Sequence, residues 1–479
     1  MTRNIAVIGA GPSGAACARK LALQGYKVTV FGDLGGRMQS QEVTPNLFSD
    51  TGASFLIGGY KETFKLIKEL GLNEALRKFI PKVTLSGPDN NGTENYILND
   101  PISMLKLNSI TPANRLKMLW MIVKLKVNAI FHQIDPFSVD SLIAFNHSSS
   151  MKNYLQEHCG NDIFARLLGP ATKALTFRDD PISVPFIKSL LLIATGKYQY
   201  LDGGINKLCE KMLDESTFAG DLGKGLTLAN KQVTKVSTAG QKYLVTASDQ
   251  GEVEFDGVVF AVPNPIAKQI APNLMDFKDD HVEWSPNIHA IFRVPSAQGR
   301  KEIVLPTGNE NSSGVATIHH LEGKYGPNAA GLVSVYLNEE KSKEIAGQNL
   351  KDEKQIARLV WEAATKLPHS GLNGDLPESV KVLGVFYRPF AMPHLVAGKG
   401  LQAVEFTEKQ RQRSDEGKPI QFVGDWTKAW IPSIEAAIRS GLEGAELLIK
   451  AFDNQVEISA PTMSQQPKTI SFSQPSAAN

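Results

Sequence analysis

The sequence has few cysteines, almost no net charge and no long apolar run, and each shortage excludes a class of protein. The three cysteines, Cys17, Cys159 and Cys209, are far apart and form no C-x-x-C pair, so we expect neither a disulfide framework nor a metal site. The net charge is +2 and the basic residues are scattered, which argues against a nucleic-acid partner. No apolar run reaches the ~20 residues of a membrane-spanning helix. The 479 residues are enough for two interleaved domains.

Glycine is plentiful near the start, where a strand, a glycine-rich turn, a helix and a second strand follow one another. The strand Asn4–Ile8 leads into the turn, and the second strand is expected at 27–31. Glycine permits a tight turn, lets the backbone approach a pyrophosphate, and allows the helix to pack closely on the strand. The start of the helix points free N–H groups at the same anion. The pattern predicts a dinucleotide-binding βαβ unit whose key residues are Gly9, Gly11, Pro12, Ser13 and Gly14.

A second glycine doublet follows the second strand, in Leu34-Gly35-Gly36-Arg37-Met38. Glycine amides there form an anion nest, and Arg37 adds a fixed positive charge. The segment resembles the G-G-R signature of the flavin-containing amine oxidase, protoporphyrinogen oxidase and phytoene desaturase superfamily. The resemblance implies FAD as the cofactor, with its pyrophosphate beside Gly35, Gly36, Arg37 and Met38. An ordinary Gly-Gly turn with a surface arginine is the alternative.

The chain departs from that superfamily at the end of the second strand. Where the family has a glutamate for the adenosine ribose, this sequence has Gly32. Asp33 follows at once and the loop before Gly35 is short, so we expect Asp33 to reach the ribose hydroxyls from a shifted position. If Asp33 is a plain turn residue, the ribose is bound by a group that the sequence does not reveal.

Three later stretches extend the resemblance. Residues 48–55 resemble the D-x-G-A segment beside the isoalloxazine ring, and residues 231–263 resemble the returning part of the FAD domain, in which a valine pairs with adenine. Residues 422–441 resemble the G-D-W-T and (S/T)-(I/M)-E-G-A-x-x-S-G tail of plant-type phytoene desaturases and hydroxysqualene dehydroxylases. The helix in this tail would stabilise negative charge at the pyrimidine edge of the flavin. These stretches add Gly52, Ala53, Ser54, Phe55, Val233, Gly424, Asp425, Ser433 and Ile434 to the predicted cofactor site.

The motifs predict an α/β fold in which a Rossmann-like FAD-binding domain is interleaved with a substrate domain of mixed β-sheet and helices. We assign residues 1–85, 200–265 and 395–452 to the FAD-binding domain, and 86–199 and 266–394 to the substrate-binding domain. Residues 453–479 are rich in Ser, Gln and Pro, a composition typical of a disordered tail.

The reaction that the resemblance implies moves a hydride from a substrate C–H bond to flavin N5. Because residues 116–127 and 186–194 are apolar, we expect a lipophilic substrate of isoprenoid, tetrapyrrole or acyl type. An amine or amino-acid oxidase that makes an imine and hydrogen peroxide is one alternative, and a redox-neutral flavin-dependent isomerase is another. The lysine that amine oxidases use near N5 has no clear counterpart, although Lys301 and Lys399 lie in the right region. The candidate catalytic residues are Tyr387, His394 and Trp430, with Arg388 and Trp426 nearby.

The remaining expectations concern the attachment of the cofactor, the partners and the location. Monoamine oxidases attach FAD to a cysteine near the C-terminus, and no cysteine follows Cys209 here, so we expect non-covalent FAD. The electron acceptor is expected to be oxygen, a quinone or a soluble carrier. The stretch 116–127 would either line an apolar pocket or make peripheral contact with a membrane. The sequence begins directly with the first strand, so we expect no signal peptide and a cytoplasmic location.

Overall fold

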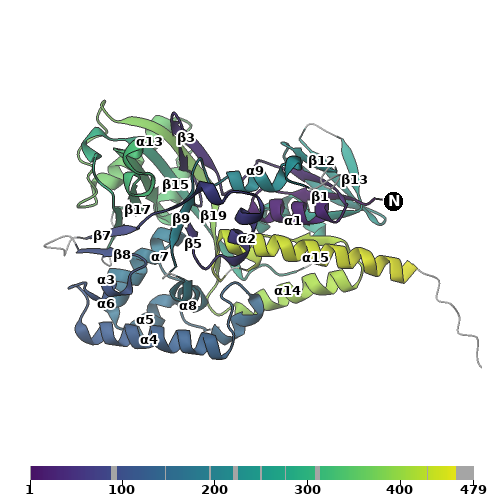
Figure 1. Cartoon of the computed structure of the whole chain (residues 1–479), viewed down its shortest axis with the longest axis horizontal. Helices are drawn as coiled ribbons and strands as arrows, with labels where there is room; N and C mark the ends of the chain where they lie inside the picture. The colour runs from purple at the N-terminus through teal and green to yellow at the C-terminus, as the bar shows by residue number, and fades with distance from the viewer. Residues whose placement is uncertain are drawn as a thin grey trace, which may run out of the picture.

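Two β-sheets of different construction form the framework of the chain in the computed structural model (Figure 1). The fold is α/β, as the motifs predicted. The structure describes residues 2–87, 94–145, 147–193, 196–218, 225–248, 251–275, 277–307, 313–428 and 430–459.

The first sheet is five-stranded, and every neighbouring pair in it is parallel. Strands β1 and β14 at its centre are almost fully buried, as expected for parallel strands covered by other elements. Its strand order and bounds are β10 (Leu226–Ala229), β2 (Lys27–Phe31), β1 (Asn4–Ile8), β14 (Gly257–Phe260) and β20 (Ile420–Phe422). The strands therefore come from all three stretches assigned to the FAD-binding domain.

Two helices from opposite ends of the chain pack together beside this sheet (Figure 1). Helix α1 is Pro12–Leu23 and helix α15 is Ile434–Ser459. A Cβ atom on Gly441 of α15 would lie 2.1 Å from the carbonyl oxygen of Ser13, so this close approach requires glycine. The contact places the N-terminal turns of both helices near the same end of the sheet, which matters for the site described below.

The second sheet has seven strands and is antiparallel except between β16 and β7. One face packs apolar residues such as Phe292 and Val335 against Trp361 of helix α13 (Glu353–Thr365). Because side chains alternate along a strand, the opposite face carries a different set, which includes His289 and Tyr336. The strands run in the order β19 (Lys381–Leu395), β15 (Val282–Arg293), β18 (Leu332–Leu337), β17 (Val315–His320), β16 (Ile303–Pro306), β7 (Lys82–Ser86) and β8 (Glu94–Ile97).

A group of helices forms the lower part of the molecule in Figure 1. Helix α4 (Pro112–Phe131) runs along its outer edge and contacts α5 (Met151–His158), α6 (Asn161–Ile163) and α8 (Val184–Ile193). Helices α3 (Pro101–Leu105) and α7 (Gly169–Thr176) belong to the same region. The other helices are α2 (Lys61–Glu69), α9 (Lys207–Leu213), α10 (Asn264–Ile270), α11 (Glu322–Tyr325), α12 (Glu339–Gly347) and α14 (Gly400–Asp415).

Smaller sheets complete the fold. Strands β3 (Ser40–Thr44) and β4 (Leu47–Asp50) form a two-stranded sheet. A three-stranded sheet has the order β5 (Leu56–Ile57), β9 (Tyr198–Leu201) and β6 (Leu76–Lys78). Another has the order β11 (Val233–Ala239), β12 (Lys242–Ala247) and β13 (Glu252–Phe255).

Two of the expected boundaries need correction. Strand β7, apart from its last residue, lies in the stretch 1–85 that was assigned to the FAD-binding domain. It nevertheless pairs with β16 and β8 in the seven-stranded sheet. Residues 453–459 continue α15 instead of starting a disordered tail, and the Nδ2 of Asn454 donates to the Ser414 carbonyl at 3.0 Å. The rest of the predicted tail, 460–479, lies outside the described residues. The division into domains otherwise stays a prediction.

Candidate active site

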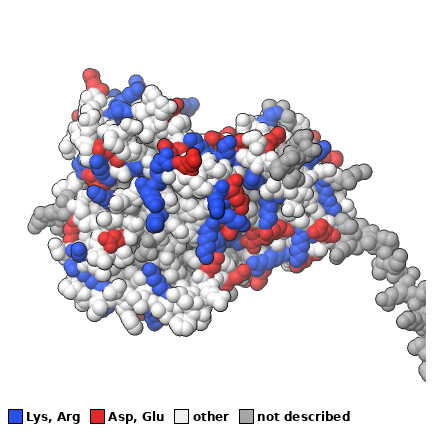
Figure 2. All heavy atoms as spheres, in the orientation of Figure 1, with Lys and Arg blue, Asp and Glu red and all other residues white. Residues whose placement is uncertain are grey.

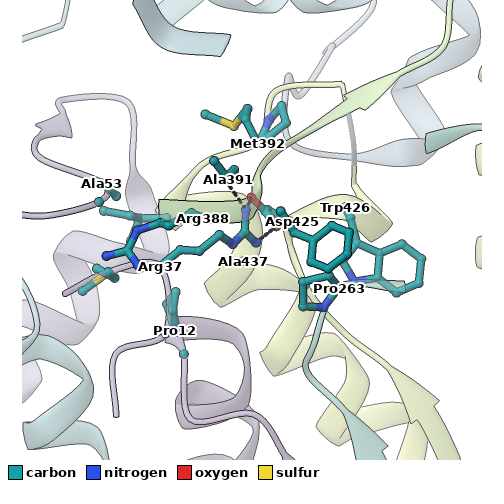
Figure 3. A pocket seen from close by; sticks show the side chains of 18 of the residues that line it. Pro12, Arg37, Ala53, Pro263, Arg388, Ala391, Met392, Asp425, Trp426 and Ala437 are labelled. Atoms are coloured by element: carbon teal, nitrogen blue, oxygen red, sulfur yellow. Dashed lines mark hydrogen bonds and ion pairs between the residues drawn. The ribbon is translucent and has the colours of Figure 1, made fainter. Parts of the chain in front are cut away.

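A cavity of about 640 Å³ is lined by residues of both large sheets and by helices α1, α7, α8 and α15 (Figure 3). Most residues predicted for the cofactor site meet there although they come from four separate stretches of sequence. Gly14, Gly35, His394 and Trp430 do not line it. The predicted residues that do are Gly9, Gly11, Pro12, Ser13, Asp33, Gly36, Arg37, Met38, Gly52, Ala53, Ser54, Phe55, Val233, Gly424, Asp425, Ser433, Ile434 and Tyr387.

The three glycines of the first turn have different roles. Gly9 has φ +115°, and a Cβ on it would lie 2.4 Å from the carbonyl oxygen of Ala261 on the neighbouring segment. A Cβ on Gly14 would lie 1.8 Å from the Gly9 carbonyl oxygen, so Gly14 permits helix-to-turn packing and does not itself face the cavity. A Cβ on Gly11 would meet no clash, because its nearest neighbour, the Gly35 carbonyl oxygen, would lie at an ordinary contact distance of 3.7 Å. Gly11 is therefore where a ligand can approach the backbone.

Two helix N-termini contribute to the cavity wall. Helix α1 follows Gly11, which has no side chain to cap it, so the first N–H groups stay available to an anion. Ser433 precedes α15, and its Oγ accepts from the Ala436 N–H at 3.1 Å. Glu435, fully buried in the first turn of α15, points elsewhere: its carboxylate accepts from the N–H groups of Glu62 and Thr63 at the start of α2.

Arg37 lies in the cavity wall and is held by two neighbours (Figure 3). Its Nη1 donates to Oδ2 of Asp425 at 3.1 Å and to the Ala391 carbonyl at 3.2 Å, and its Nη2 donates to Oδ1 of Asp425 at 2.5 Å. Its guanidinium also lies over the Trp284 ring, 5.1 Å from the centroid. Both members of the ion pair were predicted to contact the cofactor, and the structure joins them to each other.

Arg388 lines the cavity from β19 and anchors the segment that follows β4. Its Nη2 donates to the carbonyl and the hydroxyl of Thr51 at 2.9 and 3.0 Å. Burial lowers the pKa of Arg388, and the nearby Arg37 lowers it further, while Tyr336 opposes the shift. The segment from Thr51 to Phe55 is the one predicted to run beside the flavin ring, so Arg388 fixes its start.

A buried lysine holds the same segment from the other side. Lys324 Nζ donates to Oδ2 of Asp50 at 2.6 Å, to the Tyr325 hydroxyl at 2.8 Å and to the Ser54 carbonyl. Burial lowers the pKa of Lys324, although the attraction of Asp50 works in the opposite direction. No motif in the sequence marks Lys324, because nothing near it in sequence indicates that it meets Asp50.

Two of the three predicted catalytic residues lie in the core and not in the cavity. His394 Nε2 lies 2.7 Å from the Ser285 hydroxyl, and burial lowers the pKa of this imidazole to about 3. Trp430 is 1% exposed and meets Phe145 edge to face. Tyr387 lines the cavity and is half exposed.

The two lysines considered for the position near N5 also lie elsewhere. Lys301 is exposed and forms an ion pair with Glu322. Lys399 forms an ion pair with Asp280. Neither lysine lines the cavity.

The cavity also has polar residues that sequence reasoning missed. They lie on the seven-stranded sheet, on the face opposite to α13. No local motif marks them. The alternation of side chains along β15 separates the two faces of the strand, but it does not show which face lines the cavity. These residues are Asn287, His289, Thr317, His319 and Tyr336.

The site contains what a flavin dinucleotide requires, and none of the three cysteines is among its lining. The glycine-rich turn and the start of α1 suit a pyrophosphate, and the start of α15 suits a group that gains negative charge. Cys17, Cys159 and Cys209 are buried away from the cavity. Within the described residues there is no group of His, Cys, Asp and Glu side chains that could hold a metal ion.

Comparison with known proteins agrees with this geometry. A mitochondrial protoporphyrinogen oxidase of Nicotiana tabacum is 30% identical over 185 residues, which cover 38% of this chain and 34% of that protein. The chain spans about a third of the length of the curated relatives it matches. Solved structures show the same fold. A fatty acid isomerase of P. acnes has a TM-score of 0.64 at 14% identity and covers 94% of this chain and 99% of its own.

Cyclohexylamine oxidase of Brevibacterium oxydans has a TM-score of 0.63 at 16% identity, covering 95% of this chain and 100% of its own. These likenesses concern the fold alone. The family model, in contrast, extends over most of the sequence, from residue 12 to residue 449. The chain therefore belongs to the family of flavin-containing amine oxidoreductases, as its motifs predicted.

Proposed function

We propose that the chain binds FAD non-covalently and oxidises a lipophilic small molecule by accepting a hydride from one of its C–H bonds. The proposal rests on one observation: two parts of the cavity are lined by residues of different chemical character. One part has the glycine-rich turn and the start of α1, which suit a dinucleotide. Another part, from α7 and α8, is apolar and consists of Leu175, Phe186, Leu190 and Ile193.

Several residues of the chain would hold the FAD. The first turn of α1 and Arg37 would contact the pyrophosphate, and Asp33, which lines the cavity and is exposed, would bond the ribose. Bound flavin supplies the hydride acceptor that the polypeptide lacks. The start of α15, after Ser433, would stabilise the negative charge that reduction places on the ring.

Attachment of the flavin is inferred from the cysteines. All three are buried and absent from the cavity lining, so no thiol of this chain is placed to form a thioether with the ring. Burial raises the pKa of Cys17 and of Cys209 to about 12, which keeps these thiols protonated and unreactive. We therefore assign FAD as a dissociable cofactor.

The charges in the cavity favour a lipophilic substrate over an amine. Among the lining residues the structure describes, the carboxylates are those of Asp33 and Asp425, and Asp425 is paired with Arg37. Neither residue belongs to the apolar part next to α8, so that part offers no counter-ion to an alkylammonium group. The curated relative is a protoporphyrinogen oxidase, which supports a tetrapyrrole among the lipophilic candidates.

The experiment starts from the visible absorption spectrum of the purified protein and of the supernatant after acid precipitation. Flavin bands released into the supernatant are the expected result, and a colourless protein that takes up no added FAD would refute the proposal. Anaerobic mixing with protoporphyrinogen IX, an isoprenoid polyene or an unsaturated fatty acid should then bleach the flavin. Bleaching by simple amines with peroxide release in air would favour the amine oxidase, and conversion without bleaching would favour the isomerase.

We also propose that α4 contacts a membrane surface from which an apolar substrate enters. Its large exposed apolar side chains recur at helical spacing and are Leu116, Leu119, Trp120, Val123, Val127, Ile130 and Phe131. Trp120 is 68% exposed and Phe131 80%. The helix sequence contains basic residues and no acidic ones, and Figure 2 shows the lower edge of the molecule as mostly white with a few blue residues. No helix in the described part of the chain could cross a bilayer.

A smaller cavity of about 120 Å³ lies behind α4 and is lined by Met118 and Ile122 from that helix. It shares five lining residues with the main cavity, Phe55, Ala174, Leu175, Leu190 and His319, so the two cavities adjoin. Flotation with vesicles that contain anionic lipid should recover the protein, and Trp120→Glu should abolish recovery. Equal flotation of both proteins would contradict the proposal. We further propose that the electron acceptor is oxygen, a quinone or a soluble carrier. We also propose that the protein is cytoplasmic.

A further inference from the structure

One wall of the main cavity is a row of side chains that crosses the seven-stranded sheet. In the strand registers, His289 of β15 lies opposite Phe386 of β19 on one side and Tyr336 of β18 on the other. Thr317 of β17 lies opposite Tyr336. Strand pairing therefore places these side chains next to one another in a row, and His289, Tyr336 and Thr317 of this row line the main cavity.

His289 is held between two aromatic rings. Its ring lies 4.7 Å from the Phe386 ring at an interplanar angle of 21°, and 4.6 Å from the Tyr336 ring at 16°. Because its neighbours stand on opposite sides of β15, both faces of the imidazole are covered and its edge meets the cavity. His289 is 1% exposed, and Nε2 has no hydrogen-bond partner among the described residues. The stack fixes the ring without using its polar atoms.

A neutral imidazole carries one donor and one acceptor, and leaving them unused in a buried site costs stability. Burial lowers the pKa of His289 to about 3, and the nearby positive charge of Arg388 acts in the same direction. The ring therefore remains neutral at physiological pH. Such a residue is suited to accept or donate one hydrogen bond to a ligand that excludes water from the cavity.

Arg388 lies next to this histidine on the same wall. It pairs across the strands with Asn287, which is two residues from His289 and therefore on the same face of the sheet. The Nε and Nη2 of Arg388 bond to Thr51, while its Nη1 has no hydrogen-bond partner among the described residues. Asn287 donates through Nδ2 to the Leu337 carbonyl at 2.8 Å. The part of the cavity wall formed by His289 and Arg388, called this corner below, thus combines a positive charge with an imidazole Nε2 that has no hydrogen-bond partner among the described residues.

The surroundings determine which chemical group fits. No carboxylate of the described lining lies on this sheet, and Arg388 supplies a positive charge, so the corner suits a hydrogen-bond acceptor with negative charge. The apolar residues of α7 and α8 complete the lining of the cavity. A ligand that matches both parts has an apolar body and one anionic end.

We propose that His289 and Arg388 bind the carboxylate of a lipophilic carboxylic-acid substrate, whose apolar body lies against α8. The inference rests on the proposed function and narrows its substrate class. Arg388 donates from Nη1 to one carboxylate oxygen, and the imidazole N–H of His289 donates to the other. His289 and Arg388 are specificity-determining residues in this assignment.

The test compares three ligands of one chain length, decanoate, 1-decanol and methyl decanoate, on the FAD-loaded protein. Binding is read from the change in the flavin absorption spectrum and from calorimetry. Decanoate should bind about tenfold or more tightly than the other two, the value expected for a charge-assisted hydrogen bond. Equal affinities for all three ligands would overturn the proposal.

Variants assign the effect to residues. His289→Phe keeps the stack and removes the polar edge, so it should weaken decanoate binding by about tenfold and leave 1-decanol binding unchanged. Arg388→Gln removes the charge and also the bonds to Thr51, so it should weaken decanoate binding more than 1-decanol binding. His158→Phe, an exposed histidine stacked on Tyr154, is the matched control and should change neither ligand. Equal losses for decanoate and 1-decanol in His289→Phe would mean that the row is merely structural, and the proposal would fail.

Failure of the proposed function looks different from failure of this inference. A wild-type protein without flavin bands refutes the cofactor assignment, whatever decanoate does. A flavin-containing protein that does not distinguish decanoate from 1-decanol keeps the cofactor assignment and refutes the carboxylate site. If His289→Phe does not fold, the ligand comparison on the unaltered chain still decides the question.

Discussion

Arg37 and Asp425 are 388 positions apart in the sequence, and they form a two-point ion pair in the cavity wall, at 3.1 and 2.5 Å (Figure 3). Arg37 belongs to the glycine-rich loop after β2, and Asp425 follows β20. The pair therefore joins the first and last pieces of the parallel-sheet region. Both residues line the cavity, as do Pro12 and Ser13 at the start of α1.

A double-mutant cycle on this pair is the first prediction. Arg37→Gln and Asp425→Asn should each weaken FAD binding by about tenfold, since each leaves a charged partner without its hydrogen bonds. The double variant should lose clearly less than the sum of the two, because the same interaction is removed twice. FAD titration by fluorescence quenching measures the dissociation constants of the wild type, the two single variants and the double variant. Strictly additive losses would show that the two residues act separately.

The sequence allowed prediction of those parts of the site that depend on local geometry. Gly9, Gly11 and Gly14 were assignable because a strand, a tight turn and a helix start are neighbours in sequence. Arg37 was assigned through the resemblance of its segment to the G-G-R signature, which the neighbouring glycine doublet supports physically. The partners of these residues, such as Asp425, could be placed only through the resemblance to a known family.

The errors arose where strand register decides which way a side chain points. His394 lies on β19, whose pairing with β15 is shifted between Ser285 and Asn287. Two residues of β15 there oppose four of β19, so β19 does not follow a simple alternation between Arg388 and Met392, and the position of His394 relative to Tyr387 could not be read from spacing. His289 was missed because its environment is made by Phe386 and by residues of other strands. Such contacts exist only after the sheet has formed.

Gly11 and Gly14 should respond differently to substitution, although both belong to one motif. Gly11 has φ −76° and ψ −178°, which valine adopts readily, and there is space beside it. Gly11→Val should therefore fold with little change in thermal midpoint but give colourless protein. Gly14→Ala should fail to fold, because its Cβ would lie 1.8 Å from the Gly9 carbonyl. Full flavin occupancy in Gly11→Val would contradict the placement of the cofactor.

Asp33 provides a test of how the ribose is bound. It lines the cavity and is exposed, and its carbonyl accepts from the Gly36 N–H at 3.3 Å. Asp33→Ala should weaken the binding of FAD by ~1–3 kcal/mol if the carboxylate accepts hydrogen bonds from the ribose hydroxyls. Asp33→Asn should lose less, because an amide still accepts a hydrogen bond. Unchanged dissociation constants in both variants would make Asp33 a turn residue.

Stability should fall as the pH drops below 6.5. In the folded protein, burial lowers the pKa of several histidines well below the ordinary value of 6.5, whereas in the unfolded chain the same imidazoles bind protons near pH 6.5. Stability from this source is complete above 6.5 and is lost progressively toward the folded pKa values. Each such imidazole should cost roughly 1 kcal/mol by pH 5.5. The histidines are His281 and His320, with pKa values of about 4, and His289, His319 and His394, at about 3.

Urea unfolding at pH 7.5, 6.5 and 5.5, at one FAD concentration, measures this dependence. His320→Gln keeps a donor for the Ser370 carbonyl and removes one imidazole, so its stability should fall less steeply with acid. His158→Gln changes an exposed histidine and should follow the wild-type curve. A wild-type midpoint that stays constant from pH 7.5 to 5.5 would show that these histidines bind protons equally in the folded and unfolded states.

The buried pair of Lys324 and Asp50 should be more important for stability than any surface ion pair. Their side chains are 9% and 2% exposed, and Lys324 also holds the Ser54 carbonyl beside the cavity. Lys324→Met leaves the Asp50 carboxylate buried without its cation and should lower the free energy of unfolding by ~3–5 kcal/mol. The double variant with Asp50→Asn should recover much of this loss, because the uncompensated charge is gone.

Lys301→Met is the matched control for that prediction. Lys301 is 54% exposed and pairs with Glu322, so its loss should cost less than ~1 kcal/mol. Because Ser54 lines the cavity, Lys324→Met should also shift the absorption spectrum of any bound flavin, and Lys301→Met should not. Equal unfolding midpoints for the two methionine variants would mean that Asp50 becomes protonated or finds another donor. The Tyr325 hydroxyl, 3.0 Å from Oδ2 of Asp50, is such a donor on the same oxygen that Lys324 contacts. Tyr325→Phe combined with Lys324→Met would then reveal the missing loss of stability.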